Sequence, residues 1–104
     1  SIDSLHAAAQ KFGCKTVALT VPEHPAEAFY PAVQKLRATI NAGLRELHAH
    51  GRASIVVDVA SCLPRHTEPS LWDKDGLHLS AHGYDRLAAL VREGARDIFD
   101  DLRE

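Results

Sequence analysis

Apolar side chains recur three or four residues apart in three segments of the chain, which is the spacing of one face of an α-helix. The first segment ends at Gly13, and glycine is favoured just beyond a helix C-terminus. The second stops before Gly51, and the third follows Ser80, a good N-cap residue. These positions are Ile2, Leu5, Ala8, Ala9 and Phe12, then Val33, Leu36, Ile40, Leu44 and Leu47, then Leu87, Leu90, Val91, Ile98 and Leu102. The pattern predicts three helices.

Two other segments are apolar without alternation. Residues 14–21 (CKTVALTV) and 54–60 (SIVVDVA) are rich in β-branched residues and lack the apolar/polar alternation of a half-exposed strand. Such runs are typical of strands that are buried on both faces, as in parallel sheets. Residues 22–31 contain three prolines and residues 61–79 two more, so we expect loops there.

The predicted order is therefore helix, strand, helix, strand, helix, within a single partial domain over residues 1–104. Its middle three elements form a βαβ unit, so the fold class is α/β with a parallel sheet. Two strands that are apolar on both faces need helices on both sides and partners along their outer edges. Three helices and no further strand do not supply that cover. We expect the missing strands to come from an upstream half or from a self-associated copy.

Composition and charge remove several classes of function. The chain is 45% hydrophobic and 25% charged, which is ordinary for a globular protein. Twelve basic and 14 acidic side chains give a formal net charge of -2 without a basic stretch, so nucleic acid is not an expected partner. No apolar run approaches the roughly 20 residues that span a bilayer. Because the sequence opens on Ser1 and has no methionine, we expect a processed, excised or truncated piece.

The most polar, turn-rich stretch with candidate chemistry is LWDKDGLHLSAHGY, residues 71–84. Asp75 precedes His78 by three residues on a predicted loop, and Gly76 allows a tight turn between them. A carboxylate at this spacing can accept the Nδ1 proton of the imidazole and leave Nε2 as a general base. Alone, the spacing is also compatible with an ordinary surface loop.

The surroundings of this pair resemble a known family. Read from Trp72 to Ala88, the pattern W-x-x-DGLHLS-x-x-GY-x-x-LA is similar to the last conserved block of the SGNH, or GDSL, serine hydrolases. Three upstream features fit the same order: Thr20-Val21-Pro22 after the first strand, Asn41 in the following helix and Asp58 after the second strand. The nearest subgroup is that of the isoamyl-acetate-hydrolysing esterases. The resemblance implies the C-terminal half of a three-layer α/β/α, flavodoxin-like fold.

The resemblance also implies roles for two residues. His78 would be the general base of a Ser-His-Asp triad and Asp75 would orient its ring, in an enzyme that hydrolyses carboxylic esters without a cofactor or metal. The family's nucleophile and oxyanion-hole blocks lie upstream of the matched region, and this sequence does not contain them. Ser4 in IDSL is a poor substitute, because no strand precedes it and it lies within a helical pattern. The chain alone is therefore expected to be inactive.

Other polar and aromatic residues keep two interpretations each. Trp72 either lines an acyl pocket or anchors the loop, and His24 either contacts the small acyl ester substrate or is simply exposed. His78 and His82 are four residues apart, but the expected N-cap at Ser80 falls between them, so no metal site is predicted. A different class of function also stays open: a non-catalytic binding or regulatory module that keeps part of the hydrolase fold. The sequence specifies neither the compartment nor the acyl chain.

Overall fold

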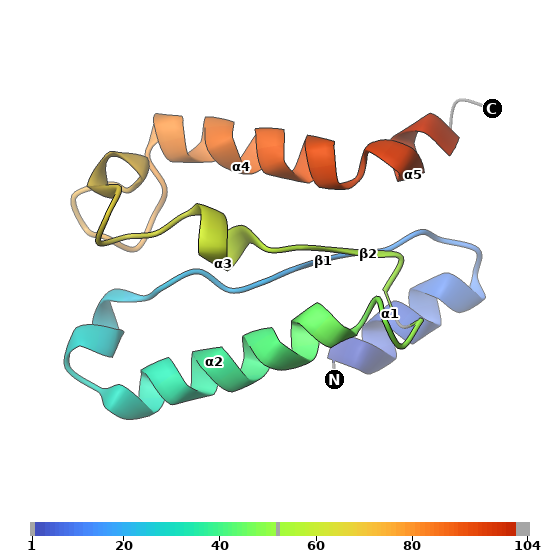
Figure 1. Cartoon of the computed structure of the whole chain (residues 1–104), viewed down its shortest axis with the longest axis horizontal. Coiled ribbons are helices and arrows are strands. Elements are labelled where there is room, and N and C mark those ends of the chain that lie inside the picture. The colour runs from blue at the N-terminus through green and yellow to red at the C-terminus, as the bar shows by residue number, and fades with distance from the viewer. Residues whose placement is uncertain (1, 52, 102–104) are drawn as a thin grey trace.

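The fold is built around two short parallel strands with helices on both faces. The computed structural model describes residues 2–51 and 53–101. Within them the order is α1 (Ile2–Lys11), β1 (Val17–Leu19), η1 (Pro25–Ala28), α2 (Pro31–Glu46), β2 (Ile55–Val57), α3 (Val59–Cys62), η2 (Pro69–Leu71), α4 (Ala81–Gly94) and α5 (Arg96–Asp101), where η denotes a 3₁₀-helix. The two strands lie between α2 and α4 (Figure 1). The predicted α/β class and parallel pairing are confirmed.

The sheet has the register expected of a βαβ unit. Val17 pairs with Ile55, Ala18 with Val56 and Leu19 with Val57. Because neighbouring residues of a strand face opposite sides, Ala18 and Val56 pack against Leu44 and Leu47 beneath α2. Val57 packs on the other side with residues that include Val59, Leu63, Leu71 and Trp72, and with the partly buried Leu87 and Leu90 of α4. Each face of the sheet therefore has its own small core.

Several predicted elements differ in extent from the structure. Both strands have three residues rather than seven or eight, and the second is followed directly by the short helix α3. The last helix is interrupted between Gly94 and Arg96, where the backbone of Ala95 leaves the helical conformation. A Cβ built on Gly94 would lie 2.7 Å from Cγ2 of Val57, so glycine lets the helix approach β2 closely. Leu102 of the predicted stripe lies outside the described residues.

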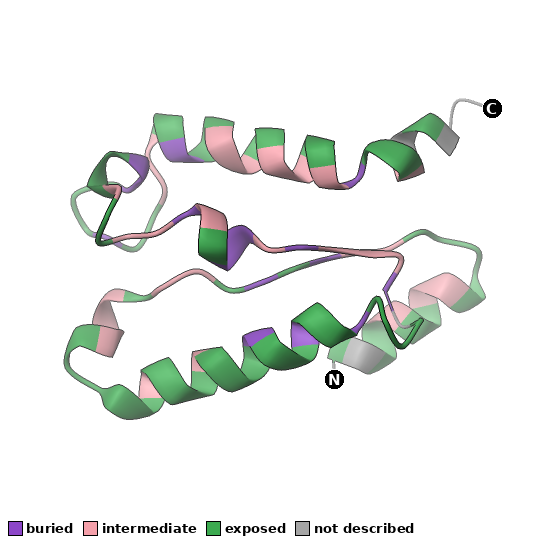
Figure 2. Ribbon diagram, viewed as in Figure 1, coloured by how far each residue is buried: buried purple, intermediate pink, exposed green. Residues whose placement is uncertain are grey.

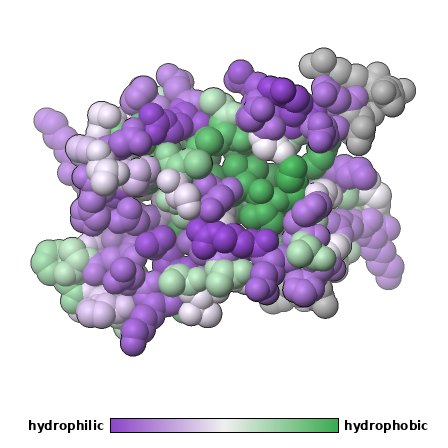
Figure 3. Space-filling view, viewed as in Figure 1, coloured by the Kyte–Doolittle hydropathy of each residue, from purple (hydrophilic) through white to green (hydrophobic). Residues whose placement is uncertain are grey.

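Much of the predicted apolar surface is not covered. Leu5 and Phe12 of α1 are 71% and 86% exposed, and Leu36 of α2 is 61% exposed. On the open side of β1, Leu19 and Val21 are exposed as well. Figure 2 shows that buried residues gather in the strands, the C-terminal part of α2, the short helix α3 and the segment before α4. Gly83 within α4 and Ala95 after it are buried as well. Figure 3 shows hydrophobic surface beside the strands and below α4 and α5. The expectation of strands buried on both faces is met only in part.

The cysteines and the helices of the described chain add two plain observations. Cys14 and Cys62 are both free thiols, before β1 and at the end of α3 respectively. Among the helices of the described chain, none combines the length and the apolarity required to cross a membrane.

Candidate active site

The loop that carries Asp75 and His78 is closed at its base by backbone hydrogen bonds. Trp72 and Leu79 form an isolated antiparallel bridge. The Asp73 N–H donates to the His78 carbonyl at 2.8 Å, and the Gly76 N–H donates to the Asp73 carbonyl at 2.9 Å. Gly76 has φ +68°, a left-handed conformation that costs glycine little. These contacts fold residues 72–79 into a tight loop.

The end of this loop is fixed to the start of α4. The Ser80 hydroxyl accepts a hydrogen bond from the Gly83 N–H at 3.1 Å and donates one to the Ser70 carbonyl. The Ser80 N–H donates to the Leu71 carbonyl at 2.9 Å. The N-cap predicted at Ser80 is thus confirmed. As an N-cap, this residue ties α4, η2 and the loop together.

Within the loop, Asp75 and His78 form a direct hydrogen bond. Oδ2 of Asp75 lies 2.7 Å from Nδ1 of His78. Oδ1 of Asp75 accepts the backbone N–H groups of Leu77 at 2.9 Å and of His78 at 3.0 Å. Because three hydrogen bonds hold the carboxylate, it can keep the imidazole in the tautomer with the proton on Nδ1. That tautomer leaves the lone pair of Nε2 available to accept a proton.

The electrostatics of the pair follow from this geometry. The hydrogen bond from His78, assisted by the backbone N–H groups of His78 and Leu77, lowers the pKa of Asp75 to about 2. The hydrogen bond and negative charge of Asp75 raise the pKa of His78 above its ordinary value, with a smaller contribution from Asp73. The side chains of His78 and Asp75 are 64% and 50% exposed, so solvent screens their interaction.

The loop is anchored by Leu71, which precedes it, and by Trp72, its first residue. Leu71 is fully buried, and Trp72 is 9% exposed within the core beneath α4. Trp72 therefore anchors the loop, and it also lines an open pocket, so both of its sequence interpretations keep a structural basis. This pocket has a volume of about 490 Å³ and is lined by Arg65, His66, Pro69, Trp72, Asp73, Lys74 and Gly76.

A second polar cluster follows the C-terminal ends of the strands. The buried Thr20 hydroxyl donates to Oδ1 of Asp58 at 2.8 Å and accepts the Ala60 N–H at 2.8 Å. Arg45 of α2 forms an ion pair with Asp58 at 3.0 Å. The hydrogen bond from Arg45, followed by those from Thr20 and Ser61, lowers the pKa of Asp58 to about 2 although partial burial opposes it. These bonds connect the ends of β1, β2 and α2.

Asn41 and His24 are both engaged with backbone. The Asn41 side chain, 2% exposed, accepts the Val21 N–H at 2.7 Å and donates to the Val21 carbonyl at 2.9 Å. It thus satisfies both backbone hydrogen-bonding groups of Val21, just beyond β1. Nδ1 of His24 accepts the Ala26 N–H at 3.0 Å and caps η1. This role accounts for His24 without a ligand, and its contact with substrate stays a prediction.

Sequence reasoning missed Arg65, whose guanidinium lies beside Gly76 of the loop. A Cβ built on Gly76 would lie 2.7 Å from Nη2 and 2.8 Å from Nε of Arg65. The backbone N–H of Arg65 donates to Glu23, in the segment after β1, at 3.2 Å. No spacing rule marks an arginine in a long loop as a neighbour of a glycine eleven residues later. Only the folded loop brings them together.

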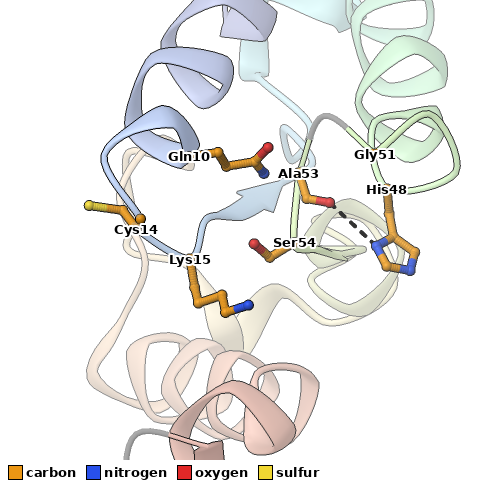
Figure 4. A pocket seen from close by; sticks show the side chains of 8 residues that line it. Gln10, Cys14, Lys15, His48, Gly51, Ala53 and Ser54 are labelled. Carbon is orange, nitrogen blue, oxygen red and sulfur yellow. Dashed lines mark hydrogen bonds between the residues drawn. The ribbon is translucent and has the colours of Figure 1, made fainter.

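A different pocket lies at the N-terminal ends of the strands. It has a volume of about 380 Å³ and is lined by Gln10, Gly13, Cys14, Lys15, His48, Gly51, Ala53 and Ser54. In Figure 4 the Cys14 side chain points away from the other labelled side chains, and His48 is engaged with the Ala53 carbonyl at 3.4 Å. Ser4 belongs to α1, which lies at the opposite end of the long axis from the His78 loop (Figure 1).

Within residues 2–51 and 53–101, no group of three or more His, Cys, Asp or Glu side chains is arranged to hold a metal ion. Comparison of the chain with known protein families, with curated proteins and with solved structures found no match. The candidate site is therefore defined by its own geometry: an exposed, backbone-fixed Asp75–His78 pair.

Proposed function

We propose that this chain is the C-terminal portion of an SGNH-type ester hydrolase, with a flavodoxin-like three-layer fold when complete. The observation that carries the proposal is the Asp75–His78 pair, in which two backbone N–H groups fix the carboxylate that holds Nδ1. An incidental surface ion pair does not require such a fixed carboxylate. The similarity of residues 72–88 to the family's last block supports the same assignment.

The proposed reaction follows from the tautomer of His78. Nε2 accepts the proton of a serine hydroxyl as its oxygen attacks the carbonyl carbon of a small or medium acyl ester. The C–O bond of the tetrahedral intermediate then breaks, and the imidazolium protonates the leaving alkoxide. Water, deprotonated by Nε2, hydrolyses the acyl-enzyme in the same way. Asp75 stabilises the imidazolium at each step, and the serine and oxyanion donors come from the upstream half.

The position of the pair agrees with this reaction. In Figure 1 the loop that follows η2 lies on the side toward which both strands run, and the C-terminal edge of a parallel sheet is where α/β enzymes bind substrates. Thr20 and Asp58 directly follow the strands on that side. The pair lies on a loop outside the core, so it can be altered without unfolding the chain.

The test is reconstitution with the upstream reading frame. The chain alone should hydrolyse p-nitrophenyl acetate no faster than exposed imidazole does, because it lacks a nucleophile and oxyanion donors. Co-expression with the upstream half should give saturable turnover and stoichiometric labelling by a fluorophosphonate. His78→Ala should abolish nearly all turnover, whereas His82→Ala, which removes an exposed histidine of α4, should preserve it.

Two results would reject the assignment. If His82→Ala were more damaging than His78→Ala, the general base would be a different residue. If the upstream frame lacked Gly-Asp-Ser and Gly-x-Asn-Asp blocks and a start codon stood just before Ser1, we would favour the second candidate, a binding or regulatory module. The exposed Leu19 and Val21 beside the open edge of β1 suit such a module equally well.

A further inference from the structure

We propose that the pocket beside the His78 loop is an anion site, in which Arg65, assisted by Lys74, binds the carboxylate or phosphate group of a small molecule. The open pocket of about 490 Å³ is large enough for such a group. It is formed by one side of the loop and by residues 65–69, which lead into η2. The binding of an anion is independent of the proposed function. The further implication, that the enzyme selects esters carrying an anionic group, rests on the proposed function.

The first observation is the state of the Arg65 guanidinium. Four other arginines of the described chain, Arg37, Arg45, Arg86 and Arg96, each form an ion pair with a carboxylate. Arg65 is half-buried, and its side chain forms no ion pair with any carboxylate of residues 2–51 and 53–101. Its Nε is buried and has no hydrogen-bond partner among them. A partly desolvated guanidinium favours an oxyanion as its partner.

The second observation is how Arg65 is held. Its backbone N–H bonds Glu23, and its guanidinium lies against the bare Cα of Gly76. The contact with Gly76 limits the rotamers open to the guanidinium, so less side-chain freedom is lost when an anion binds. A side chain at position 76 would displace the guanidinium, and the positive φ of Gly76 already disfavours one. The arginine is thus preorganised at the pocket wall.

The third observation is the charge of the lining. Lys74 adds a second cation, and Asp73 is the acidic residue of the wall. The nearby Glu23 accepts the Arg65 N–H and lies 3.5 Å from Nε2 of His66, so it is already engaged. Trp72 supplies an aromatic surface, and its buried indole N–H also lacks a hydrogen-bond partner within the described chain. The wall therefore combines two positive charges with one negative charge and a flat apolar surface.

The experiment uses Trp72, the single tryptophan of the sequence, as the reporter. Indole N–H shifts and fluorescence are followed while the ¹⁵N-labelled chain is titrated with inorganic phosphate and, separately, with succinate. Sodium chloride at matched ionic strength is the reference. We expect a saturable change with the oxyanions and none of that size with chloride. Preference for phosphate or succinate identifies the kind of anionic group.

Substitutions then assign the binding to Arg65. Arg65→Met should weaken binding about tenfold or more, the range for losing a hydrogen bond between charged groups. Arg65→Lys should give an intermediate affinity, because it keeps the charge and loses the planar fork. Arg92→Met, on the exposed side of α4, is the matched control and should bind as the unaltered chain does. Lys74→Gln provides a second test if Arg65→Met does not fold, and it should also weaken binding.

The proposal is overturned if chloride reproduces the change, or if Arg65→Met and Lys74→Gln both bind normally. These readouts need no nucleophile. A chain that binds phosphate through Arg65 but never supports ester hydrolysis would keep the anion site and reject the proposed function. Esterase activity after reconstitution, without anion binding, would keep the proposed function and reject the anion site.

Discussion

Gly83→Ala should destabilise the chain, although the same change in most helices is favourable. Gly83 lies in the first turn of α4, and a Cβ there would be 1.9 Å from the Leu71 carbonyl oxygen and 3.1 Å from Cβ of Leu79. That carbonyl also accepts the Ser80 N–H at 2.9 Å. The methyl group therefore cannot be accommodated unless α4 moves away from η2, which also breaks the bond at Ser80.

The magnitude follows from two destabilising effects and one stabilising effect. Overpacking against a rigid backbone costs about 1–3 kcal/mol, and loss of a backbone hydrogen bond costs about 1 kcal/mol more. Replacing glycine by alanine inside a helix returns about 1 kcal/mol. The free energy of unfolding should therefore fall by about 1–3 kcal/mol. Gly43→Ala is the matched control, because a Cβ on Gly43 of α2 meets nothing within 4 Å; it should raise the free energy of unfolding by about 0.5–1 kcal/mol.

The assay is urea unfolding of both variants and the unaltered chain at one protein concentration, followed by circular dichroism and Trp72 fluorescence. The unfolding midpoint should fall for Gly83→Ala and rise for Gly43→Ala with similar slopes. Trp72 should also change its native emission in Gly83→Ala, because it follows Leu71 directly and anchors the loop. If Gly83→Ala raised the midpoint as Gly43→Ala does, the close approach of α4 to η2 would be wrong.

Three further outcomes are expected. Asp75→Asn should lower the pKa of His78 toward 6.5, which an NMR titration measures. Because pairing raises the pKa of His78 and lowers that of Asp75 to about 2, the pair stabilises the fold fully between about pH 4 and pH 6.5. This stabilisation is lost at higher pH as His78 deprotonates and at lower pH as Asp75 is protonated. An unchanged pKa would refute the pairing. Thr20→Val should lower the free energy of unfolding in urea by about 1–3 kcal/mol, because it leaves the buried Ala60 N–H without its acceptor and removes one of the hydrogen bonds to Asp58. Thr39→Val on the exposed side of α2 should change it by no more than about 0.5 kcal/mol, and equal effects would contradict the role of Thr20. In sedimentation experiments the chain alone should self-associate through its exposed apolar surface. A monomer at all concentrations that also melts sharply would show that two strands are enough for a stable fold.

The sequence predicted correctly those features that depend on residues close together in the chain. The Ser80 cap and the order of strands and helices depend on neighbours within a few residues, and the structure has them. The Asp75–His78 contact also lies within one loop, so its spacing was sufficient to suggest it. The parallel pairing followed from two apolar runs separated by a helix.

The rest depended on contacts between distant segments. Nothing near Gly94 in the sequence indicates that Val57 lies against it and that the last helix is interrupted there. The apolar face of α1 was a correct helix signal, but periodicity cannot say what covers that face, and Phe12 is exposed in the structure. Arg65 was missed for the same reason, since its partners are Glu23 and Gly76.

The Asp75–His78 pair and the open edge of β1 are both exposed to water. The Asp75–His78 pair has the geometry of a general base, but water around it weakens every charge interaction that catalysis would use. Beside β1, Leu19 and Val21 similarly retain contact with water. On the proposed function, further strands paired along β1 would place their own C-terminal ends next to this loop, because the strands are parallel. The same segment would then cover the edge, exclude water from His78 and bring the nucleophile, so stability and activity should be restored together.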